Sequence, residues 1–308
     1  AATLDLAVCS SHPMTAAPSS MDGRVCVVTG ATNGIGKATA FALAWLGATV
    51  VIVARDAGRA ALAVAEIERE TGNRSTEVVL ADFASLQAVR SAAAEIARRH
   101  RAIHVLVNNA GRASKQRMLS ADGLEMTFAV NHLAPFLFTR ELLPLLSAGA
   151  PARIVNVASA GEARGPIRFD DLQSERNYRG FTAYAMSKLA NVLFTYELAS
   201  RLVGTGITAN CLHPGTVGTN LLRQIPRWLY ALLSPVLLTA AQGAETVVFL
   251  AASPQMEGVS GGYFQKCRAV RSSKRSYDAD TRVRLWNVSE ELVNAHLATA
   301  PASIKSTT

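Results

Sequence analysis

The sequence has few cysteines and no long apolar run, and both absences narrow its class. Its four cysteines lie far apart among 308 residues and form no C-x-x-C pair, which excludes zinc-finger spacing and a redox dithiol. A reducing compartment fits this usage best. The longest apolar runs, such as Ile103–Val107 and Leu229–Leu233, fall well short of the roughly 18 to 20 residues that span a bilayer. We therefore expect no transmembrane segment and a cytoplasmic location.

Charged residues are also scarce, at 18% of the chain against 49% hydrophobic residues. This composition predicts a buried core and excludes a disordered protein. The net charge of +8 suits an acidic partner, which could be nucleic acid, an anionic membrane or a phosphorylated small molecule. Basic residues gather near the C-terminus without interleaved aromatics or a nucleic-acid-binding motif, so we interpret them as a solvated face and expect no nucleic-acid partner. They are Lys266, Arg268, Arg271, Lys274, Arg275, Arg282 and Arg284.

The chain divides into a short arm and one long region. Residues 1–20 have no clear periodicity and no Arg, and match neither a secretory signal nor a transit peptide, so we interpret them as a flexible arm or a non-native remnant. From residue 21 to 308, β-branched runs alternate with Ala- and Leu-rich helical stretches, which predicts one α/β domain: a single doubly wound parallel sheet of the Rossmann type with helices on both faces. The predicted strands are Val25–Thr29, Thr49–Ala54, Thr76–Leu80, Val105–Val107, Arg153–Ala158, Ile207–Leu212 and Gly262–Gln265.

The first predicted strand ends in a glycine-rich turn, Thr29-Gly30-Ala31-Thr32-Asn33-Gly34-Ile35-Gly36, and a helical stretch from Lys37 to Leu46 follows at once. Glycines permit a tight turn and let backbone N–H groups approach a phosphate at the positive end of the helix. Alone, this pattern also fits an ordinary strand-to-helix turn. Three further motifs follow, each after or beside a predicted strand or helix: Asn108-Asn109-Ala110-Gly111, Ser159, and Tyr184-Ala185-Met186-Ser187-Lys188.

In this order the motifs resemble the short-chain dehydrogenase/reductase family, over about residues 22 to 294. The stretches Tyr184–Thr195, His213–Val217, Gly261–Phe264 and Arg284–Val288 look most like its retinol dehydrogenase-like branch. Better-known members of that branch oxidise or reduce retinoids and other lipophilic carbonyls. The resemblance implies an oxidoreductase that interconverts a lipophilic aldehyde or ketone and its alcohol, as a carbonyl reductase or alcohol dehydrogenase.

Charge after the second strand indicates which nicotinamide cofactor is used. An acidic side chain there would accept from the ribose 2′-hydroxyl of NAD, whereas a cation would meet the 2′-phosphate of NADP. The strand ends in Val53-Ala54-Arg55-Asp56. Arg55 can present a planar fork to a phosphate, and Lys37 can add a point charge. NADP(H) is thus favoured over NAD(H), although Arg55 could instead point to water and Asp56 could cap the next helix.

The resemblance assigns further cofactor contacts. Asp82 would hold the adenine, the Asn-Ala-Gly part of the second motif would line the adenosine, and the loop that begins at Pro214 would hold the nicotinamide carboxamide; Phe83 replaces a more usual aliphatic residue. The complete expected set is Gly30, Thr32, Asn33, Gly34, Ile35, Gly36, Lys37, Arg55, Asp82, Phe83, Asn109, Ala110, Gly111, Tyr184, Lys188, Pro214, Gly215, Val217 and Thr219.

Tyr184 and Lys188 are four residues apart, so on a helix they share one face. A phenol with a pKa near 10 exchanges protons poorly at neutral pH, and a neighbouring ammonium stabilises the phenolate and lowers that pKa. The resemblance makes Tyr184 the acid/base and gives Lys188 a second role in holding the nicotinamide ribose. In isolation, such a pair would be surface decoration.

Two more polar residues complete the expected catalytic set. Ser159 ends a buried strand, where its hydroxyl can donate to a substrate oxygen, although Ser is also common there for turn reasons. Asn131 matches the family's helical Asn, which joins the proton relay through water. His132 and His213 lack carboxylate or Cys companions at metal-ligand spacing, so we interpret both as structural and expect no metal.

Apolar residues between Thr219 and Thr239 occupy the position of the family's variable substrate lid, around residues 216–240. Such a lid suits a hydrophobic substrate and would exclude water. Alternatively, these residues complete the core, or dock shallowly on a membrane beside Arg223 and Arg227. The residues most expected to form the lid are Leu221, Leu222, Trp228 and Tyr230.

Two rival functions follow from the same sequence. A redox sensor would bind dinucleotide without turning it over, and would need the glycine turn but not Ser159, Tyr184 and Lys188 together. A basic nucleic-acid-binding protein would show salt-sensitive binding that survives loss of the dinucleotide site. A homo-oligomer is compatible with the sequence.

Overall fold

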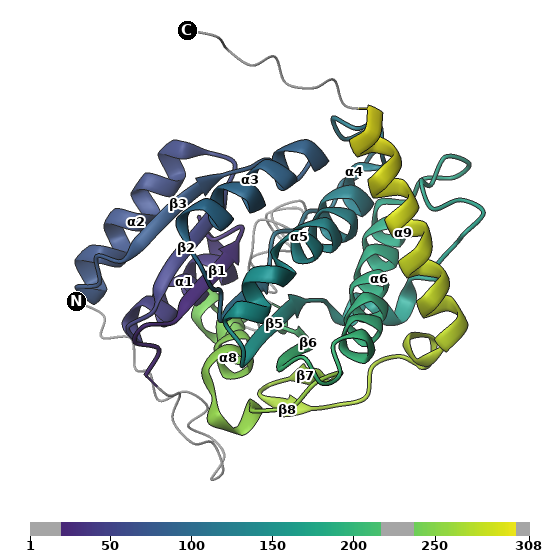
Figure 1. Ribbon diagram of the computed structural model, residues 1–308. Coiled ribbons are helices and arrows are strands. Elements are labelled where there is room, and N and C mark those ends of the chain that lie inside the picture. The colour runs from purple at the N-terminus through teal and green to yellow at the C-terminus, as the bar shows by residue number, and fades with distance from the viewer. Residues whose placement is uncertain (1–19, 217–236, 300–308) are drawn as a thin grey trace, which may run out of the picture.

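The computed structural model describes residues 20–216 and 237–299, which form a sheet with helices on both faces (Figure 1). In the first half of the chain, strands and helices alternate, as the sequence predicts. In order, the elements are β1 (Val25–Thr29), α1 (Gly34–Trp45), β2 (Thr49–Ala54), α2 (Ala57–Thr71), β3 (Thr76–Leu80), α3 (Leu86–Arg99) and β4 (Val105–Asn108).

The second half supplies the long helices and the far edge of the sheet. A π-helical turn at Ala129–Leu133 precedes α5, and 3₁₀ turns lie at Ala160–Arg164, Pro254–Met256 and Lys274–Tyr277. The other elements are α4 (Met126–Phe128), α5 (Ala134–Ala148), β5 (Ala152–Val157), α6 (Gly180–Arg201), β6 (Ile207–His213), α8 (Ala240–Ala252), β7 (Tyr263–Gln265), β8 (Arg268–Ala269) and α9 (Ala279–Thr299).

The strand order is β3-β2-β1-β4-β5-β6-β7-β8, and every neighbouring pair up to β7 is parallel. The sheet therefore confirms the predicted doubly wound fold. Its order reverses between β1 and β4, because β2 and β3 extend the sheet to one side and β4 to β6 to the other. In open α/β sheets, ligands bind at the carboxyl ends of the strands near such a reversal.

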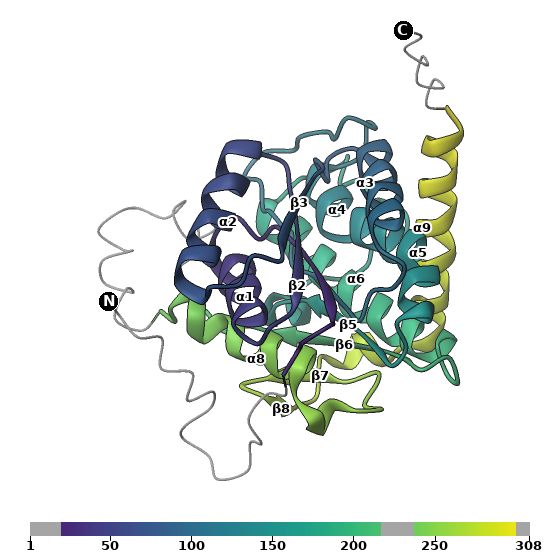
Figure 2. The same ribbon diagram turned by 60° about the vertical axis from the view of Figure 1, so that its left-hand side comes forward.

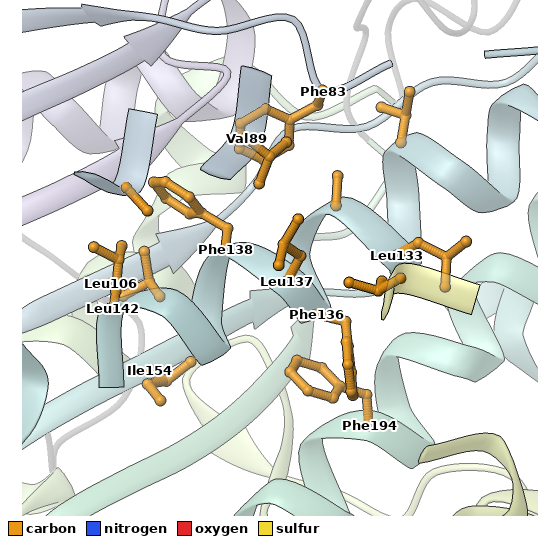
Figure 3. Close-up of a cluster of buried hydrophobic side chains, with 14 of the residues drawn as sticks. Phe83, Val89, Leu106, Leu133, Phe136, Leu137, Phe138, Leu142, Ile154 and Phe194 are labelled. Atoms are coloured by element: carbon orange, nitrogen blue, oxygen red, sulfur yellow. The ribbon is translucent and has the colours of Figure 1, made fainter. Parts of the chain in front are cut away.

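Helices on both faces explain why the strands read as continuous apolar runs. On one face of the sheet lie α1, α2 and α8, and on the other lie α3, α5 and α6 (Figure 2). The first group packs on the side chains of Val28 and Ile52, and the second packs on those of Val27 and Leu106. Figure 3 shows the second core, where α5 contributes a row of aromatic and aliphatic side chains. α9 packs against the outer side of α6.

The predicted elements differ from the structure mainly at their ends. α1 begins at Gly34, three residues before the expected start, because the glycine turn winds directly into the helix. α6 begins at Gly180, four residues before the tyrosine of the Tyr–Lys motif. β8, which is antiparallel to β7, was not predicted. Its turn places Lys266 and Cys267 at φ values of 50° and 58°, a conformation usually signalled by Gly or Asn, so the sequence gives no sign of it.

The C-terminal basic residues are less uniformly solvated than predicted. Arg282 donates from Nε to Glu197 Oε2 at 2.9 Å, and the Arg284 guanidinium lies 4.1 Å from the centre of the Phe169 ring. Arg284 and the other five basic residues of this group are exposed, and Arg282 is partly buried.

No helix of the described ranges, 20–216 and 237–299, is both long and apolar enough to cross a membrane. The boundary at residue 20, the single-domain organisation and the lid around 216–240 stay predictions.

Candidate active site

The glycine turn after β1 places α1 close to the neighbouring strands. Gly30 and Gly34 have positive φ values of 67° and 54°. A side chain at Gly36 would collide with the Asn109 amide and with the carbonyl oxygen of Gly30. Glycine is therefore required at this crossing, because α1 approaches the β4 turn without room for a Cβ.

A hydrogen-bond network holds the turn after β4 against β1. The buried Thr29 Oγ1 accepts from the backbone N–H groups of Asn109 and Ala110 at 3.0 and 2.9 Å. Asn109 Nδ2 in turn donates to the Thr29 carbonyl at 2.8 Å. These bonds join the glycine-rich turn after β1 to the Asn-Asn-Ala-Gly turn after β4, at the carboxyl ends of the strands. The two motifs are about 80 residues apart in the sequence.

The N-terminus of α1 fits the diphosphate of a nicotinamide dinucleotide. The N-cap residue Asn33 is extended and its side chain makes no capping hydrogen bond. Backbone donors of the first helical turn therefore remain for a ligand anion, at the positive end of the helix. Thr32 and Ile35 lie in the same turn, and the missing side chains of Gly30 and Gly36 permit close approach.

The carboxyl end of β2 presents an exposed cation. Arg55 is exposed, and no ion pair joins it to another residue in the described part of the chain. Asp56 is the N-cap of α2 and accepts from the Arg59 N–H at 2.9 Å. Lys37 donates to both carboxylate oxygens of Glu66 at 2.7 Å, so its charge is already paired. Of the two cations predicted to meet a 2′-phosphate, Lys37 is therefore engaged in an ion pair, and Arg55 has no ion pair among the described residues.

The remaining expected cofactor residues are spread around the same edge. Asp82 is exposed, and its Oδ1 accepts from the Ala84 N–H at 3.0 Å. Phe83 is buried, with its ring edge-on to Phe138 at 5.5 Å between centroids (Figure 3), so its side chain belongs to the core. Pro214 and Gly215 follow β6. The other expected residues of this loop and of the lid lie outside the described residues: Val217, Thr219, Leu221, Leu222, Trp228 and Tyr230.

Ser159, Tyr184 and Lys188 lie together where β5 ends and α6 passes. Ser159 is the N-cap of the 3₁₀ turn, and its Oγ accepts from the Gly161 N–H at 3.2 Å. Its hydroxyl lies close enough to the Tyr184 phenol to act on the pKa of that group. Lys188 Nζ lies 5.8 Å from the centre of the Tyr184 ring and donates to the Val157 carbonyl at 2.8 Å. The structure thus brings together three of the four predicted catalytic residues.

Burial dominates the pKa values of this cluster. Desolvation raises the pKa of Tyr184 above its usual range, and the hydrogen bond from Ser159 acts in the opposite direction. Burial also lowers the pKa of Lys188 to about 8. The sequence predicts a net depression of the tyrosine pKa by the ammonium. In the structure, the pKa of Tyr184 is raised instead, because the low-dielectric surroundings penalise the phenolate.

The fourth predicted residue, Asn131, lies in the π-helical turn behind this cluster and is fully buried. Its Oδ1 accepts from the Arg112 N–H at 2.8 Å, and its Nδ2 donates to the Arg112 carbonyl and the Ser187 hydroxyl, both at 2.9 Å. Ser187 donates to the Tyr184 carbonyl at 2.7 Å. A Cβ on Gly111 would lie 3.4 Å from Asn131 Oδ1 and 3.6 Å from Lys188 Nζ. Asn131 therefore connects the β4 turn to the helix that carries Tyr184.

Burial lowers the pKa of both histidines that were singled out from the sequence. His132 is buried, contacts the Ser289 hydroxyl through Nε2 at 2.8 Å, and has its pKa lowered by burial to about 3. His213 ends β6 and its pKa is also lowered by burial. No group of three or more His, Cys, Asp or Glu side chains could hold a metal ion in residues 20–216 and 237–299.

Sequence reasoning missed the residues that support this cluster. The backbone of Arg112 and the hydroxyl of Ser187 hold Asn131, and the buried Glu162 lies three residues after Ser159. Ser187 lies inside the tyrosine motif and could have been found from its spacing of three residues from Tyr184. Arg112 acts through its backbone, which no residue type reveals.

Comparisons with known proteins agree with this geometry. Residues 24–229 match the short chain dehydrogenase family. The chain is 42% identical over 295 residues to human retinol dehydrogenase 14, covering 90% of this chain and 88% of that protein. Among solved structures, an uncharacterised protein from Mycobacterium paratuberculosis superposes with a TM-score of 0.74 at 32% identity, covering 90% of this chain and 96% of the other.

A second solved structure, a short chain dehydrogenase from Burkholderia cenocepacia in complex with NADP, has a TM-score of 0.64 and 31% identity, covering 80% of this chain and 97% of that one. Members of this family use NAD or NADP to oxidise CH–OH groups or to reduce carbonyls. The fold, the motifs at the carboxyl edge of its sheet and these matches lead to one assignment: the chain belongs to the short-chain dehydrogenase family of oxidoreductases.

Proposed function

We propose that the protein is an NADP(H)-dependent oxidoreductase that interconverts a lipophilic aldehyde or ketone and its alcohol. The observation that carries this proposal is the convergence of Ser159, Tyr184 and Lys188 beside a turn that fits a dinucleotide. A dinucleotide sensor without turnover needs the turn but not this triad. Assays of the purified protein with aldehydes, ketones and alcohols, each with both cofactors, test the proposal; dinucleotide binding with no turnover would favour the sensor.

Each residue of the cluster has a role in the proposed reaction. The bound nicotinamide supplies the hydride in reduction and accepts it in oxidation. Ser159 donates a hydrogen bond to the substrate oxygen, and Tyr184 gives that oxygen a proton in reduction or removes one in oxidation. Lys188 stabilises the phenolate form and holds the nicotinamide ribose. Asn131 holds the turn after β4 in place and completes the proton relay.

Preference for NADP(H) is supported by the contrast between two adjacent side chains. Arg55 is exposed and free of ion pairs in the described part of the chain, whereas the carboxylate of Asp56 caps α2. The 2′-phosphate of NADP(H) would gain a charge-assisted contact from Arg55. The ribose hydroxyls of NAD(H) would need a carboxylate to accept their hydrogen bonds, and the carboxylate of Asp56 already accepts from the Arg59 N–H.

Replacing Arg55 with alanine should weaken NADP(H) binding by about 1 to 3 kcal/mol, or roughly 5- to 150-fold in Kd, and leave NAD(H) binding nearly unchanged. The reason is that only NADP(H) carries the phosphate that this guanidinium would meet. Titration of both nucleotides against wild type and Arg55→Ala measures the effect. Arg74→Ala, which removes an exposed arginine just before β3, at the amino end of the strands, is the matched control. A wild-type preference for NAD(H) would contradict the proposal and point to Asp56.

The lipophilic substrate class is supported by sequence and by likeness. Apolar residues are concentrated between Thr219 and Thr239, and the human relative is named for retinol, an apolar alcohol. An apolar segment over the nicotinamide site would exclude water from the reacting atoms and favour hydrophobic substrates. A cytoplasmic location, shallow membrane contact and a homo-oligomer stay predictions.

Catalytic efficiency should rise along a series of increasingly long apolar carbonyls, by up to about fourfold for each added CH₂, because burying one contributes roughly 0.8 kcal/mol. Trp228→Ala should flatten this dependence without changing NADP(H) affinity. kcat/KM across the series and the melting temperature of the variant are the measurements. If Trp228 only completes the core, the variant melts earlier and keeps the wild-type dependence on chain length, and the main argument for a lipophilic substrate is lost.

A further inference from the structure

Glu162 is a buried carboxylate next to the proposed catalytic serine. Its side chain is 3% exposed, and it lies in the 3₁₀ turn whose N-cap is Ser159. Carboxylates are rarely buried unless a partner satisfies them. No Lys, Arg or His of the described ranges forms an ion pair with Glu162. Its oxygens instead accept two hydrogen bonds from one residue, the N–H of Ser273 at 2.8 Å and the Ser273 hydroxyl at 2.5 Å.

Ser273 is itself anchored to the helix that carries Tyr184. Its carbonyl accepts from the N–H and the hydroxyl of Ser276 at 3.1 and 2.7 Å. The hydroxyl of the adjacent Ser272 contacts the Ser276 hydroxyl and the Tyr196 phenol, both at 2.6 Å. Tyr196 lies on α6, twelve residues after Tyr184. Ser272, Ser273 and Ser276 therefore join the Ser159 turn to α6.

The Ser159 turn has little freedom once Glu162 is fixed. The Ser159 carbonyl accepts from the Glu162 N–H at 3.0 Å, and its hydroxyl accepts from the Gly161 N–H at 3.2 Å. A Cβ added at Gly161 would lie 3.5 Å from Ser159 Oγ and 3.6 Å from Tyr184 Cε1, so this turn packs directly on the phenol ring. A displacement of Glu162 would therefore displace the Ser159 hydroxyl relative to Tyr184.

We propose that Glu162 and Ser273 are positioning residues that hold the Ser159 hydroxyl against the Tyr184 phenol. This inference rests on the proposed function, because it assigns the two residues a part in the same reaction. It also gives the buried polar side chain a purpose, since an apolar side chain would suffice merely to fill the space.

The charged and titratable neighbours determine what a pH profile can report. Ser159 and Lys188 face the Tyr184 phenol. Around Glu162 lie Cys211 of β6 and Tyr263 of β7, and the negative charge of Glu162 contributes to raising the pKa of both groups. The Ser159 hydroxyl lowers the pKa of Tyr184, against the effect of burial. A misplaced Ser159 should therefore raise the pKa of Tyr184, and Tyr184 should act as a base only at higher pH.

The test compares Ser273→Ala, Glu162→Ala and Glu162→Gln with wild type. We expect Ser273→Ala to lower kcat about tenfold and Glu162→Ala up to about 100-fold, since a shift of about 1 Å at a reacting group can cost two orders of magnitude. In both variants the acidic limb of the kcat profile for alcohol oxidation should move to higher pH, with the Kd of the dinucleotide unchanged. Glu162→Gln should recover most of the activity, because its amide can accept from the Ser273 N–H and donate to the hydroxyl.

Ser253→Ala is the matched control: it removes another buried serine hydroxyl, one that accepts from the Gln255 N–H at the far end of α8. It should lower the melting temperature without moving the pH profile. The inference is overturned if Ser273→Ala and Glu162→Ala melt earlier but keep the wild-type kcat and pH profile. Absence of turnover in the wild type, by contrast, would refute the proposed function itself.

Discussion

Replacing Tyr184 with phenylalanine should lower kcat by about 10²- to 10⁴-fold, the usual contribution of a positioned general acid or base, and leave the Kd of the dinucleotide nearly unchanged. The substitution removes an ionisable proton and little volume. It removes the phenol oxygen beside the Ser159 hydroxyl, which is the proposed proton donor and acceptor. Steady-state kinetics and dinucleotide titration on the same preparation give both values.

Tyr178→Phe is a suitable control for this variant. The Tyr178 phenol donates to the Ser114 carbonyl at 3.0 Å, in the segment that precedes α6, and has no part in the proposed reaction. It should keep the wild-type kcat. A Tyr184→Phe enzyme with near-normal kcat would refute the acid/base mechanism, whatever the result with Tyr178.

Lys188→Ala should weaken dinucleotide binding about tenfold and lower kcat about 100-fold, because it removes both a ribose contact and a cation beside the phenolate. The ammonium loses its proton as the pH rises, and burial lowers its pKa to about 8. Dinucleotide binding by the wild type should therefore weaken as the pH rises through about 8, whereas binding by Lys188→Ala should show no such change.

Calorimetric titrations between pH 6.5 and 9.5, roughly one and a half units on either side of that pKa, measure this dependence. Lys274→Ala serves as the control for loss of one positive charge, since Lys274 is exposed. An unchanged Kd in Lys188→Ala would contradict a role in cofactor binding, and the kcat of that variant would then report the effect on Tyr184 alone.

The sequence predicts the sheet well because its signals are local and redundant. Seven of the eleven residues in the buried strands β1 and β2 are Val or Ile. The glycine turn, the turn after β4 and the Tyr–Lys pair each carry a distinctive spacing. Parallel topology then requires that these motifs meet at one edge, since every strand from β1 to β7 ends there. The family resemblance grouped Ser159, Tyr184 and Lys188, and the structure brings these three residues together.

Other parts of the site leave no local sign. The net direction of the Tyr184 pKa depends on how deeply α6 is buried, which spacing alone does not reveal. Lys37 is paired with Glu66 from a different helix, and Phe83 turns into the core beside Phe138. The partnership of Glu162 with Ser273 joins two residues of common types without any motif. Each of these features depends on packing between elements that are distant in the sequence.

The distance along the chain between Glu162 and Ser273 also bears on how the protein is made. The carboxylate is synthesised 111 residues before its donors. At about 5 to 20 residues per second, a ribosome takes roughly 6 to 22 seconds to supply them. The strands that build the dinucleotide turn are complete by Asn108, so this part of the molecule can begin to fold on the emerging chain, while the Ser159 turn waits for Ser273. Catalytic competence should therefore arise only after Ser273 has been made, later than the folding of the dinucleotide turn.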